Sequence, residues 1–482
     1  MNSGDPALRM AAAQIVQMAW AALPVGVRVR RMRSLRFAIT QHMDEIVQTV
    51  CDEVGKPPMD ALAGDVMVVL EQLRFYERHA GHLLRSRKDG KPWFFFQGAR
   101  FFRSYEPHGT VLVFAPWNYP FQLSVLPMAT ALFAGNAVLL KCSEHTPRTA
   151  RLIQELCDSA SLPKGLVQVS CDAPESASAL IDAHPDLLFF TGSAHNGVVL
   201  AQRAAALMIP TMMELGGKDA AIVFDSCDLD RTVNGIAYGS SSNAGQVCVG
   251  TKRIYVQQSI FDQFLAAFLQ RVGELRVGST TDSDIGPVRM EFVRQQLLEQ
   301  VENAVNHGAT LHTGSSVGHN ITPLVLTGVP ETSRLLREEA FGPVVCVAAF
   351  ENEEDAIQAA NASPFQLSAS VWTGDLAQGR RVASRLASGS CAINDVIRNI
   401  GNPACAFGGN RASGHGRYHG AEGLYSFSRV KTIMIMRERR KREVHWFPFQ
   451  TVTYTRLRKL LILRHGAFRL KRMIGSLSTP VQ

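Results

Sequence analysis

The spacing of hydrophobic positions separates a helical N-terminal part from a longer part in which strands alternate with helices. Through residues 7–88, apolar side chains recur at the helical period, for example at Ile46, Val50 and Val54. From Thr110 onward, short apolar runs are separated by segments long enough to form helices. This alternation predicts parallel sheets with helices on both faces, a doubly wound α/β fold.

Eight of the apolar runs are predicted as strands. They are Val111–Ala115, Ala137–Leu140, Leu166–Ser170, Leu187–Phe190, Ala220–Phe224, Arg253–Val256, Val344–Ala349 and Ser368–Trp372. The first four and the last four form two α/β regions along the chain. A length of 482 residues fits two or three domains with large cores.

Charge changes this picture only near the C-terminal end. From Lys431 onward there are 13 Lys and Arg against 2 Asp and Glu, a net charge of +11, whereas the whole chain carries +8. The preceding residues are therefore mildly acidic, which argues against a nucleic-acid-binding face. Nine cysteines without a CxxC pair argue against a disulfide framework and favour the cytoplasm.

Five short segments place reactive or cofactor-handling groups beside glycine or proline. In chain order they are Ala115–Pro120 (APWNYP), Phe190–Gly197 (FTGSAHNG), Glu214–Lys218 (ELGGK), Gly245–Cys248 (GQVC) and Glu339–Pro343 (EAFGP). In type, order and spacing they resemble the aldehyde dehydrogenase superfamily, over about residues 10 to 435. One such motif is weak, but five in order are specific. Gly416–Gly420 (GRYHG), followed by Phe427-Ser-Arg-Val, looks most like the class 3 branch.

The resemblance implies chemistry at three residues. Cys248 would be the nucleophile, Glu214 would activate the water that hydrolyses the thioester, and Asn118 would donate to the oxyanion together with the Cys248 N–H. Taken singly, these residues also fit a buried inert cysteine, a structural ion pair with Lys218 or an arginine, and a turn or helix-cap asparagine. We expect helix amides and the nicotinamide ring to lower the thiol pKa, and burial to raise the Glu214 pKa.

The resemblance also implies a nicotinamide cofactor, NAD with NADP as the alternative. The residues expected to contact it are Trp117, Lys141, Glu144, Gly192, Ser193, Gly197, Glu339 and Phe341. Lys141 and Glu144 would hold the adenosine ribose, and the helix that begins after Ser193 would face the pyrophosphate. Glu339 would hold the nicotinamide ribose, and Phe341 would line the ring. Because the Glu144 carboxylate would repel a 2′-phosphate, NAD is favoured.

Gly414–Gly420 is set aside as a second cofactor loop or a metal site. Its glycine spacing differs from that of a dinucleotide loop, and no predicted strand precedes it. His415 and His419 are four residues apart, but the glycines between them oppose a firm helix. We therefore expect no bound metal.

The sequence thus predicts NAD(P)-dependent oxidation of an aldehyde to the carboxylic acid through a cysteine thiohemiacetal and thioester. One alternative is a CoA-acylating dehydrogenase, a type that generally lacks the Glu214 base. The other is a catalytically silent binding protein on the same fold, which would be expected to have lost Cys248, Glu214 or Asn118.

The aldehyde is expected to be apolar, either aliphatic or aromatic. Aromatic residues stand near the motifs at Trp117, Tyr119 and Phe121. No pair of arginines is placed to hold a second carboxylate. Both features suit an apolar small molecule better than a semialdehyde acid.

The expected organisation is a Rossmann-type cofactor domain followed by an α/β catalytic domain, with a small β arm for oligomerisation. Their bounds are 1–213 for the cofactor domain, with part of the arm near 90–108; 214–395 for the catalytic domain; 396–435 for the return to the arm; and 436–482 for a basic tail. The resemblance implies a homodimer in which each arm covers the partner's sheet edge.

The tail is expected to contact an anionic membrane surface peripherally. Arg437–Arg442 is nearly all basic, and His445–Phe449 supplies aromatic residues. Beyond it a helical stripe is formed by Leu460, Leu463, Ala467, Leu470, Ile474 and Leu477. No uncharged run there is long enough to span a bilayer. The alternative is a helix packed on the dimer, with its charges in solvent.

Overall fold

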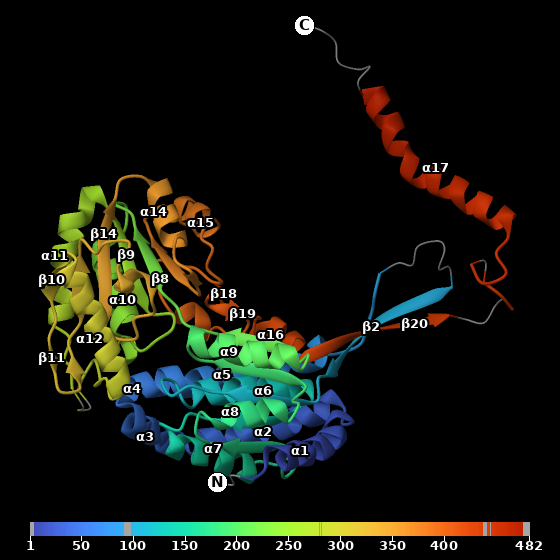
Figure 1. Cartoon of the computed structure of the whole chain (residues 1–482), viewed down its shortest axis with the longest axis horizontal. Coiled ribbons are helices and arrows are strands. Elements are labelled where there is room, and N and C mark those ends of the chain that lie inside the picture. Colours follow the sequence, from blue (N-terminus) through green and yellow to red (C-terminus); the bar gives the residue numbers. More distant parts are fainter. Residues whose placement is uncertain are drawn as a thin grey trace, which may run out of the picture. The chain divides into compact units, whose positions relative to one another are not determined.

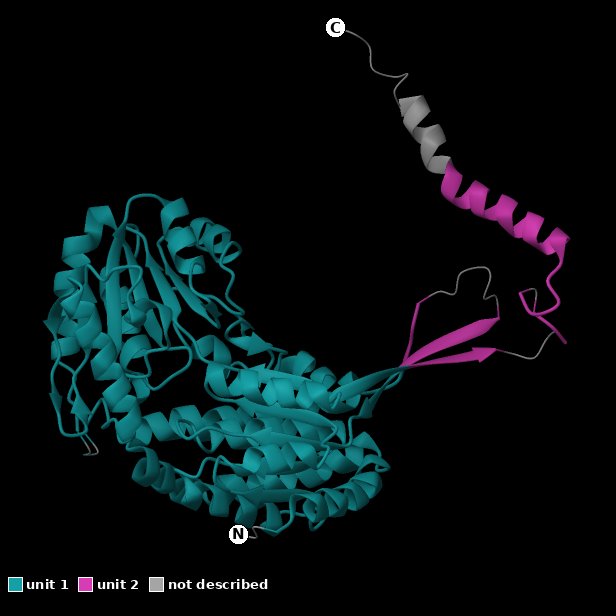
Figure 2. Cartoon of the chain, viewed as in Figure 1, with its two compact units in different colours: residues 1–86, 104–431 teal, residues 87–103, 432–482 magenta. Residues whose placement is uncertain are grey.

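The computed structural model describes residues 4–90, 98–278, 280, 282–436, 441–443 and 445–475, with side chains as far as residue 466. It forms two compact units (Figure 2). Unit 1 contains residues 1–86 and 104–431, and unit 2 contains residues 87–103 and 432–482. Every residue predicted to take part in chemistry lies in unit 1.

The first large sheet of unit 1 has six strands in the order β19-β7-β6-β3-β4-β5. Their bounds are β3 Thr110–Phe114, β4 Ala137–Lys141, β5 Val167–Ser170, β6 Leu187–Thr191, β7 Thr211–Glu214 and β19 Gly414–His415. All neighbours are parallel except β19, which runs antiparallel to β7. The chain builds outward from β3 to β5 and then crosses back to β6. The switch point therefore lies between β3 and β6, where ligands bind at the carboxyl ends of the strands.

Helices cover this sheet (Figure 1). Their bounds are α1 Pro6–Ala21, α2 Val25–Gln41, α3 Met43–Val54, α4 Pro58–Asp60, the π-helical turn η1 Ala61–Met67, α5 Val68–Leu83, α6 Gln122–Ala134, α7 Pro147–Ser159, α8 Ser176–Asp182, α9 Ala194–Ala206 and α16 Gly420–Ser426. Helix α6 is apolar around its whole circumference and completely buried, because it packs against α5 as well as β3 and β4.

The second large sheet has seven strands in the order β10-β13-β14-β9-β8-β16-β17. Their bounds are β8 Asp219–Val223, β9 Thr251–Gln257, β10 Thr310–Thr313, β13 Leu324–Thr327, β14 Val344–Phe350, β16 Ala369–Trp372 and β17 Ala392–Ile393. The accompanying helices are α10 Leu229–Ser241, α11 Phe261–Gly273, α12 Glu291–Asn306, α13 Arg334–Arg337, α14 Glu353–Asn361 and α15 Leu376–Ala383. Helices lie on both faces of this sheet (Figure 1), so the predicted α/β fold class is confirmed.

Short elements complete unit 1. They are two-residue strand pairs, β11 Ser316–Val317 with β12 Asn320–Ile321 and β15 Phe365–Gln366 with β18 Asn410–Arg411, and the 3-10 turns η3 Ser242–Gly245, η4 Gln258–Ile260 and η5 Arg398–Gly401.

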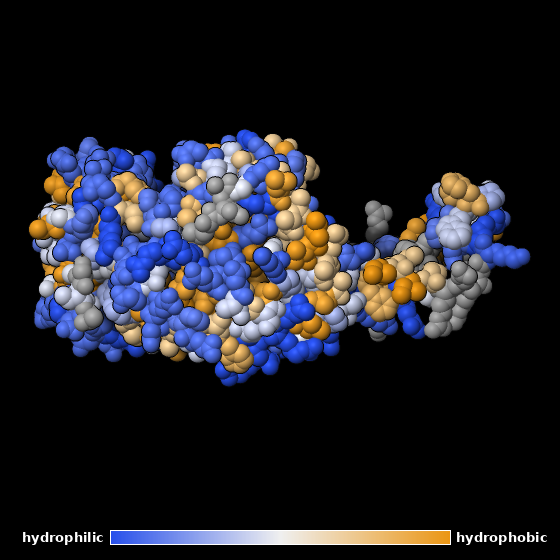
Figure 3. Space-filling view, turned by 90° about the horizontal axis from the view of Figure 1, so that it is seen from below, coloured by the Kyte–Doolittle hydropathy of each residue, from blue (hydrophilic) through white to orange (hydrophobic). Residues whose placement is uncertain are grey.

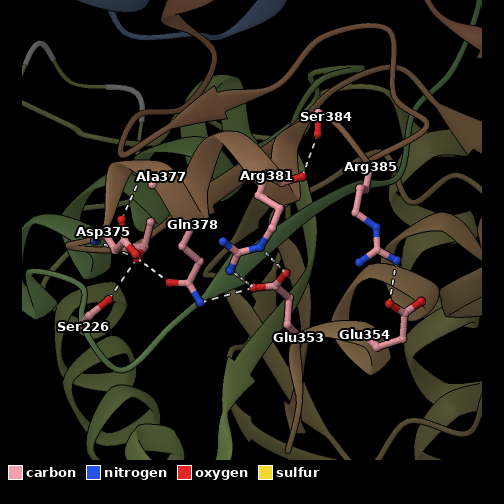
Figure 4. Close-up of polar contacts among 10 residues, drawn as sticks. Ser226, Glu353, Glu354, Asp375, Ala377, Gln378, Arg381, Ser384 and Arg385 are labelled. Atoms are coloured by element: carbon pink, nitrogen blue, oxygen red, sulfur yellow. Dashed lines mark hydrogen bonds and ion pairs between the residues drawn. The ribbon is translucent and has the colours of Figure 1, made fainter. Parts of the chain in front are cut away.

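Ion pairs fasten α14 to α15 (Figure 4). Arg381 bonds Glu353 at 2.8 Å, and Arg385 bonds Glu354 at 2.5 Å. The Asp375 carboxylate accepts the Ala377 N–H at 2.8 Å and so caps α15. Because the arginines are about half exposed, water screens these pairs and each contributes little to the stability of the fold. This cluster explains local packing and gives no indication of a site.

All eight predicted strands are present, within two residues at each end. The strands that sequence analysis did not predict include β7, which ends at Glu214, and β19, which pairs with β7 there. Strand β19 has only two residues, and its Gly414 has a φ of +104°. It therefore carries no apolar alternation from which a strand could be predicted.

Unit 2 contains a three-stranded sheet in the order β1-β2-β20, followed by a helix. The bounds are β1 Arg87–Lys88, β2 Ala99–Pro107, β20 Ser428–Met436 and α17 Thr451–Gly475. Strands β2 and β20 begin or end in unit 1. The helix predicted in the tail is present as α17, although the side chains of Ala467, Leu470 and Ile474, and the whole of Leu477, lie outside the described residues. So do Arg437–Arg440 of the basic run.

Within the described residues, no single helix has the length and apolar character to cross a membrane, and one pair bent by 119°, α1 with α2, meets those criteria jointly. No group of three His, Cys, Asp or Glu side chains in that part of the chain is arranged to hold a metal ion.

Candidate active site

The loop after β3 brings Asn118 to the switch point of the first sheet. The Asn118 side chain is buried, and its Nδ2 donates to the Gln246 carbonyl at 3.0 Å. Gln246 stands two residues before Cys248. The structure therefore joins the predicted oxyanion donor to the loop that carries the predicted nucleophile, across 128 residues of sequence.

The backbone before Cys248 is held in an unusual conformation. Asn243 and Ala244 have φ values of +49° and +54°, and Gly245 follows at +68°. A left-handed non-glycine residue costs roughly 1–2 kcal/mol, so neighbouring groups must hold this turn. The Lys252 ammonium donates to the Gly245 carbonyl at 2.8 Å, and the Asn243 amide donates to the Asn118 carbonyl at 3.0 Å.

The Cys248 thiol is half-buried, and its surroundings disfavour the thiolate. Burial raises its pKa most, the charges of Glu339, Asp219 and Glu214 raise it further, and a hydrogen bond from the Val249 N–H lowers it. We expected a lowered pKa, but in the protein alone the pKa is raised, because burial disfavours the thiolate and the nearby carboxylates add to that effect. The Cys248 N–H has no acceptor among the described residues, which leaves it able to bind an oxyanion.

Glu214 ends β7, between β6 and β19. Its carboxylate is buried, and neither oxygen has a hydrogen-bond partner among the described residues. Burial raises the pKa of Glu214 well above its ordinary value, and the Arg417 charge opposes that rise. Neither Lys218 nor an arginine forms a salt bridge with it in that part of the chain, so the structural ion-pair interpretation is not supported.

Two glycines after Glu214 let three parts of the site approach closely. A Cβ on Gly217 would lie 1.9 Å from the Cys248 carbonyl oxygen, and one on Gly216 would lie 2.4 Å from Glu339 Oε2. The Gly217 N–H donates to Glu339 Oε1 at 3.2 Å. Only glycine fits at Gly217, where the neighbour is backbone, and the two glycines together bring Glu339 and Cys248 to the turn that follows the buried carboxylate.

Two buried lysines, Lys218 and Lys252, act electrostatically on Glu339. Burial lowers the pKa of Lys218 to about 8, and burial together with the neighbouring Lys218 charge lowers that of Lys252 to about 7. Of the carboxylates, Glu339 raises the pKa values of these two lysines most. The Lys218 Nζ has no hydrogen-bond partner among the described residues. Burial raises the pKa of Glu339, and these two buried amino groups oppose that rise.

Of the remaining predicted residues, Lys141 lies at this carboxyl edge of the first sheet, whereas Phe341 lies in the loop before β14 of the second sheet. Lys141 ends β4, and its Nζ lies 3.0 Å from Glu144 Oε2. Trp117 and Phe341 come from different sheets and meet edge to face, with ring centroids 5.7 Å apart. Phe121, offered as a substrate-side aromatic, is instead fully buried in the core.

Comparisons with known proteins agree with this geometry. The model of the aldehyde dehydrogenase family matches residues 4–433. The chain belongs to the aldehyde dehydrogenase family. It is 40% identical to 4,4'-diapolycopene aldehyde oxidase of Methylomonas sp over 93% of this chain and 84% of that protein. It is 33% identical to betaine aldehyde dehydrogenase of Sinorhizobium fredii over 88% of each. The structure of Mycobacterium tuberculosis aldehyde dehydrogenase complexed with NAD+ matches with a TM-score of 0.82 and 30% identity over 88% of each chain.

The protein is therefore an NAD(P)-dependent aldehyde dehydrogenase, which oxidises a small-molecule aldehyde to the carboxylic acid. These relatives do not separate the branches of the family, so the class 3 assignment stays a prediction.

The residues present fit a dinucleotide at the switch point of this aldehyde dehydrogenase. Gly192 and Gly197 have no room for a Cβ, which would lie 2.5 Å from the Phe190 ring and 2.4 Å from Leu215. Helix α9 thus packs closely behind β6 and β7. Its N-terminus is left open, because Ser193 is exposed and caps only the Asn196 N–H at 3.3 Å. Unpaired amides at such a position attract phosphate.

Sequence analysis missed several residues that hold this site together. Asp60 and Asp65 hydrogen-bond the loops that carry Cys248 and Asn118, and Arg417 supplies the charge facing Glu214. No local motif indicates these residues, because each acts on a loop far away in sequence. Cys142, which follows Lys141, is buried, and its N–H donates to the Ser170 carbonyl at 2.8 Å, which fixes the end of β4 against β5.

Proposed function

We propose that Cys248, Glu214 and Asn118 carry the reaction as nucleophile, general base and oxyanion donor. The observation that supports this most is the Asn118–Gln246 hydrogen bond, which sets the amide beside the nucleophile loop. The unbonded Glu214 carboxylate supports the second role, because a buried carboxylate without a partner is costly and calls for a function.

The chain's own groups account for the proton and bond changes. The thiol must first lose its proton to solvent, because the thiolate is the nucleophile. The sulfur then bonds to the aldehyde carbon, and the new oxyanion takes hydrogen bonds from the Asn118 amide and the Cys248 N–H. When bound, the nicotinamide ring supplies the acceptor for the hydride that leaves this carbon.

The thioester that remains on Cys248 is hydrolysed by water. Glu214 removes a proton from the water, and the water oxygen bonds to the thioester carbon. The carbon–sulfur bond then breaks and releases the acid. A raised pKa suits a base that must exchange protons near neutral pH.

The proposed cofactor contacts are those named from the sequence. Lys141 and Glu144 would hold the adenosine ribose, and the open N-terminus of α9 after Gly192 and Ser193 would hold the pyrophosphate. Glu339 would hold the nicotinamide ribose, beside the ring-lining pair Trp117 and Phe341.

Replacing the nucleophile tests the mechanism. Cys248→Ala is expected to abolish aldehyde oxidation while NAD still quenches the intrinsic tryptophan fluorescence, because the cofactor contacts are left intact. Retained turnover in this variant would remove Cys248 from the mechanism.

An apolar aldehyde is the proposed substrate. It is supported by the 40% identity to a protein named for an aldehyde of 4,4'-diapolycopene, which is an unsaturated hydrocarbon. Arg417 is the arginine whose charge acts on Glu214. Its guanidinium donates to the Gly409 and Gly416 carbonyls and so is not free to hold a second carboxylate. The expected kcat/KM rises with chain length through a series of linear aldehydes. A preference for succinate semialdehyde or betaine aldehyde would contradict this assignment.

A homodimer is the proposed assembly. Strand β20 is an edge strand of nine residues, and Ile433, Met434 and Ile435 on it are 40%, 51% and 51% exposed. A long apolar edge strand is a template for pairing with another chain. A second copy would cover it, as the resemblance implies. A monomer in light scattering at micromolar concentration would contradict the dimer.

Peripheral contact with a membrane is proposed for unit 2. Trp446, Phe447 and Phe449 are 53%, 78% and 75% exposed, and hydrophobic residues gather on this unit (Figure 3). Helix α17 carries seven Lys and Arg and no Asp or Glu. Exposed aromatics beside a basic helix suit the headgroup region of an anionic bilayer.

The nine cysteines are all free, which supports a cytoplasmic location.

A further inference from the structure

Two aspartates from one short helical segment reach both loops of the candidate site. Asp60 ends α4, and Asp65 lies five residues later within the π-helical turn η1. Asp65 is completely buried, and Asp60 is half-buried. Neither aspartate belongs to any motif quoted from the sequence.

Asp60 holds the turn before the nucleophile. Its Oδ2 accepts the Asn243 N–H at 2.6 Å, and its Oδ1 accepts the Ser242 hydroxyl at 3.0 Å. Asn243 is the first of the three left-handed residues in this turn, and its side chain donates to the Asn118 carbonyl. Asp60 thus fixes the residue that links the two loops.

Asp65 holds the loop of Asn118 from its other end. Its Oδ1 accepts the Phe121 and Gln122 N–H groups, both at 3.2 Å, where α6 begins. Its Oδ2 lies 2.9 Å from Lys56 Nζ, and neither side chain of this ion pair is exposed. The Lys56 ammonium also lies 3.5 Å from the centre of the Tyr119 ring, the residue after Asn118.

The π-helical turn explains why two residues five apart can act together. In an α-helix with 3.6 residues per turn, positions five apart point about 140° away from each other. In a π-helix the hydrogen bonds run from residue i to i+5, so such positions lie nearly above one another. The turn at Ala61–Met67 therefore presents both carboxylates toward the same pair of loops.

We propose that Asp60 and Asp65 are positioning residues that set the placement of Asn118 relative to Cys248 for oxyanion binding. This inference rests on the catalytic roles proposed above for those two residues. Asp60 acts through Asn243 on the nucleophile loop, and Asp65 acts through the start of α6 on the Asn118 loop.

Asp60 is the residue to test, because removing Asp65 would leave the Lys56 ammonium buried without a counter-charge and would threaten folding. Asp60→Ala is expected to lower kcat about 10- to 100-fold, as a displacement near 1 Å does, with KM for aldehyde and NAD within about twofold. Asp60→Asn should restore most of the rate, since its amide oxygen accepts the Asn243 N–H and its NH2 donates to the Ser242 hydroxyl. Asp44→Asn, on the exposed surface of α3, is the matched control and should behave as the parent.

A double-mutant cycle distinguishes positioning from general weakening. In an Asn118→Ala background, Asp60→Ala should cost less than about threefold in kcat, because the donor it positions is already missing. Should Asp60→Ala fold poorly, Ser242→Ala removes only the hydroxyl bond and is expected to show a smaller loss with the same non-additivity. Equal losses in both backgrounds, or parental activity in Asp60→Ala, would overturn the inference. That result is separable from a failure of the proposed function, which would appear as turnover in Cys248→Ala.

Discussion

Gly217→Ala should disable the enzyme through one added methyl group. Gly217 is buried, and the new Cβ would lie 1.9 Å from the Cys248 carbonyl oxygen. Carbon–oxygen contacts in proteins are about 3.3–3.6 Å, so the Gly217 turn or the Cys248 backbone must move by about 1.4 Å. The neighbour is backbone at the nucleophile itself, so no flexible side chain can absorb the change.

The expected cost divides between rate and stability. A displacement of about 1 Å at a reacting group lowers rate about 100-fold, and overpacking of this kind costs about 1–3 kcal/mol of unfolding free energy. Gly273→Ala provides the matched control, because a Cβ there meets nothing within 4 Å and the residue ends helix α11. It should leave activity unchanged and add up to about 1 kcal/mol of stability, since alanine has the higher helix propensity.

The assay is kcat and the pre-steady-state NADH burst for both variants, well below their melting temperatures. Gly217→Ala should show a slowed burst with bound NAD still detectable by fluorescence, which separates misplacement of Cys248 from loss of the fold. The reasoning is refuted if Gly217→Ala keeps the parental burst rate, or if Gly273→Ala loses as much activity.

Two further predictions concern the Glu214 carboxylate. Glu214→Gln should give an NADH burst of about one equivalent and then stall, because the thioester is no longer hydrolysed; unchanged steady-state turnover would make Glu214 structural, and CoA should then be tried as the acyl acceptor. Arg417→Gln should move the acid limb of the steady-state pH profile to higher pH, since the Arg417 charge holds down the raised pKa of Glu214, and a base with a higher pKa becomes protonated sooner as pH falls. Arg417→Lys keeps the charge and should leave the limb in place, so a limb that does not move in Arg417→Gln would exclude this coupling.

Local patterns predicted the strands and the motif residues, because both are written in short stretches of sequence. Val111–Ala115 and Leu187–Phe190 are apolar runs of the length of a buried strand, and the structure places the ends of those strands together at the switch point. The location of Asn118 and of the glycines after β6 could be predicted, because each follows a strand that ends at that edge of the sheet. The distances between them could not be predicted, because they depend on the order of the strands in the sheet.

Long-range contacts account for what the sequence did not predict. The pKa of Cys248 is set by burial and by the carboxylates of Glu214, Asp219 and Glu339, all distant from it in sequence, so it could not be judged from the neighbouring residues. Asp60 meets Asn243 across 183 residues, and Arg417 meets the Glu214 strand only because β19 adds to β7. Each of these contacts is a consequence of the tertiary fold.

The tail can be tested by removing it and by reversing its charge. A chain ending at Lys441 should stay active, because every proposed catalytic and cofactor residue lies in unit 1, but it should lose salt-sensitive sedimentation with anionic liposomes. Each basic residue near an anionic surface contributes about 1 kcal/mol, and three such residues correspond to roughly a hundredfold in the partition coefficient. Arg456, Arg458 and Lys459 lie within about one turn of α17. Changing all three to Glu should therefore lose at least that factor while keeping the helix and its apolar residues.

The charge-reversed chain distinguishes electrostatic binding from non-specific adsorption to liposomes. Binding to zwitterionic liposomes should be weak for the parent and should not depend on salt, because Debye screening acts only on charged pairs. If the full-length enzyme does not sediment with anionic liposomes, the basic helix instead packs on the dimer with its charges in solvent. In that case truncation at Lys441 would change the mass or the stability of the dimer in light scattering, and the proposed contact with a membrane would be wrong.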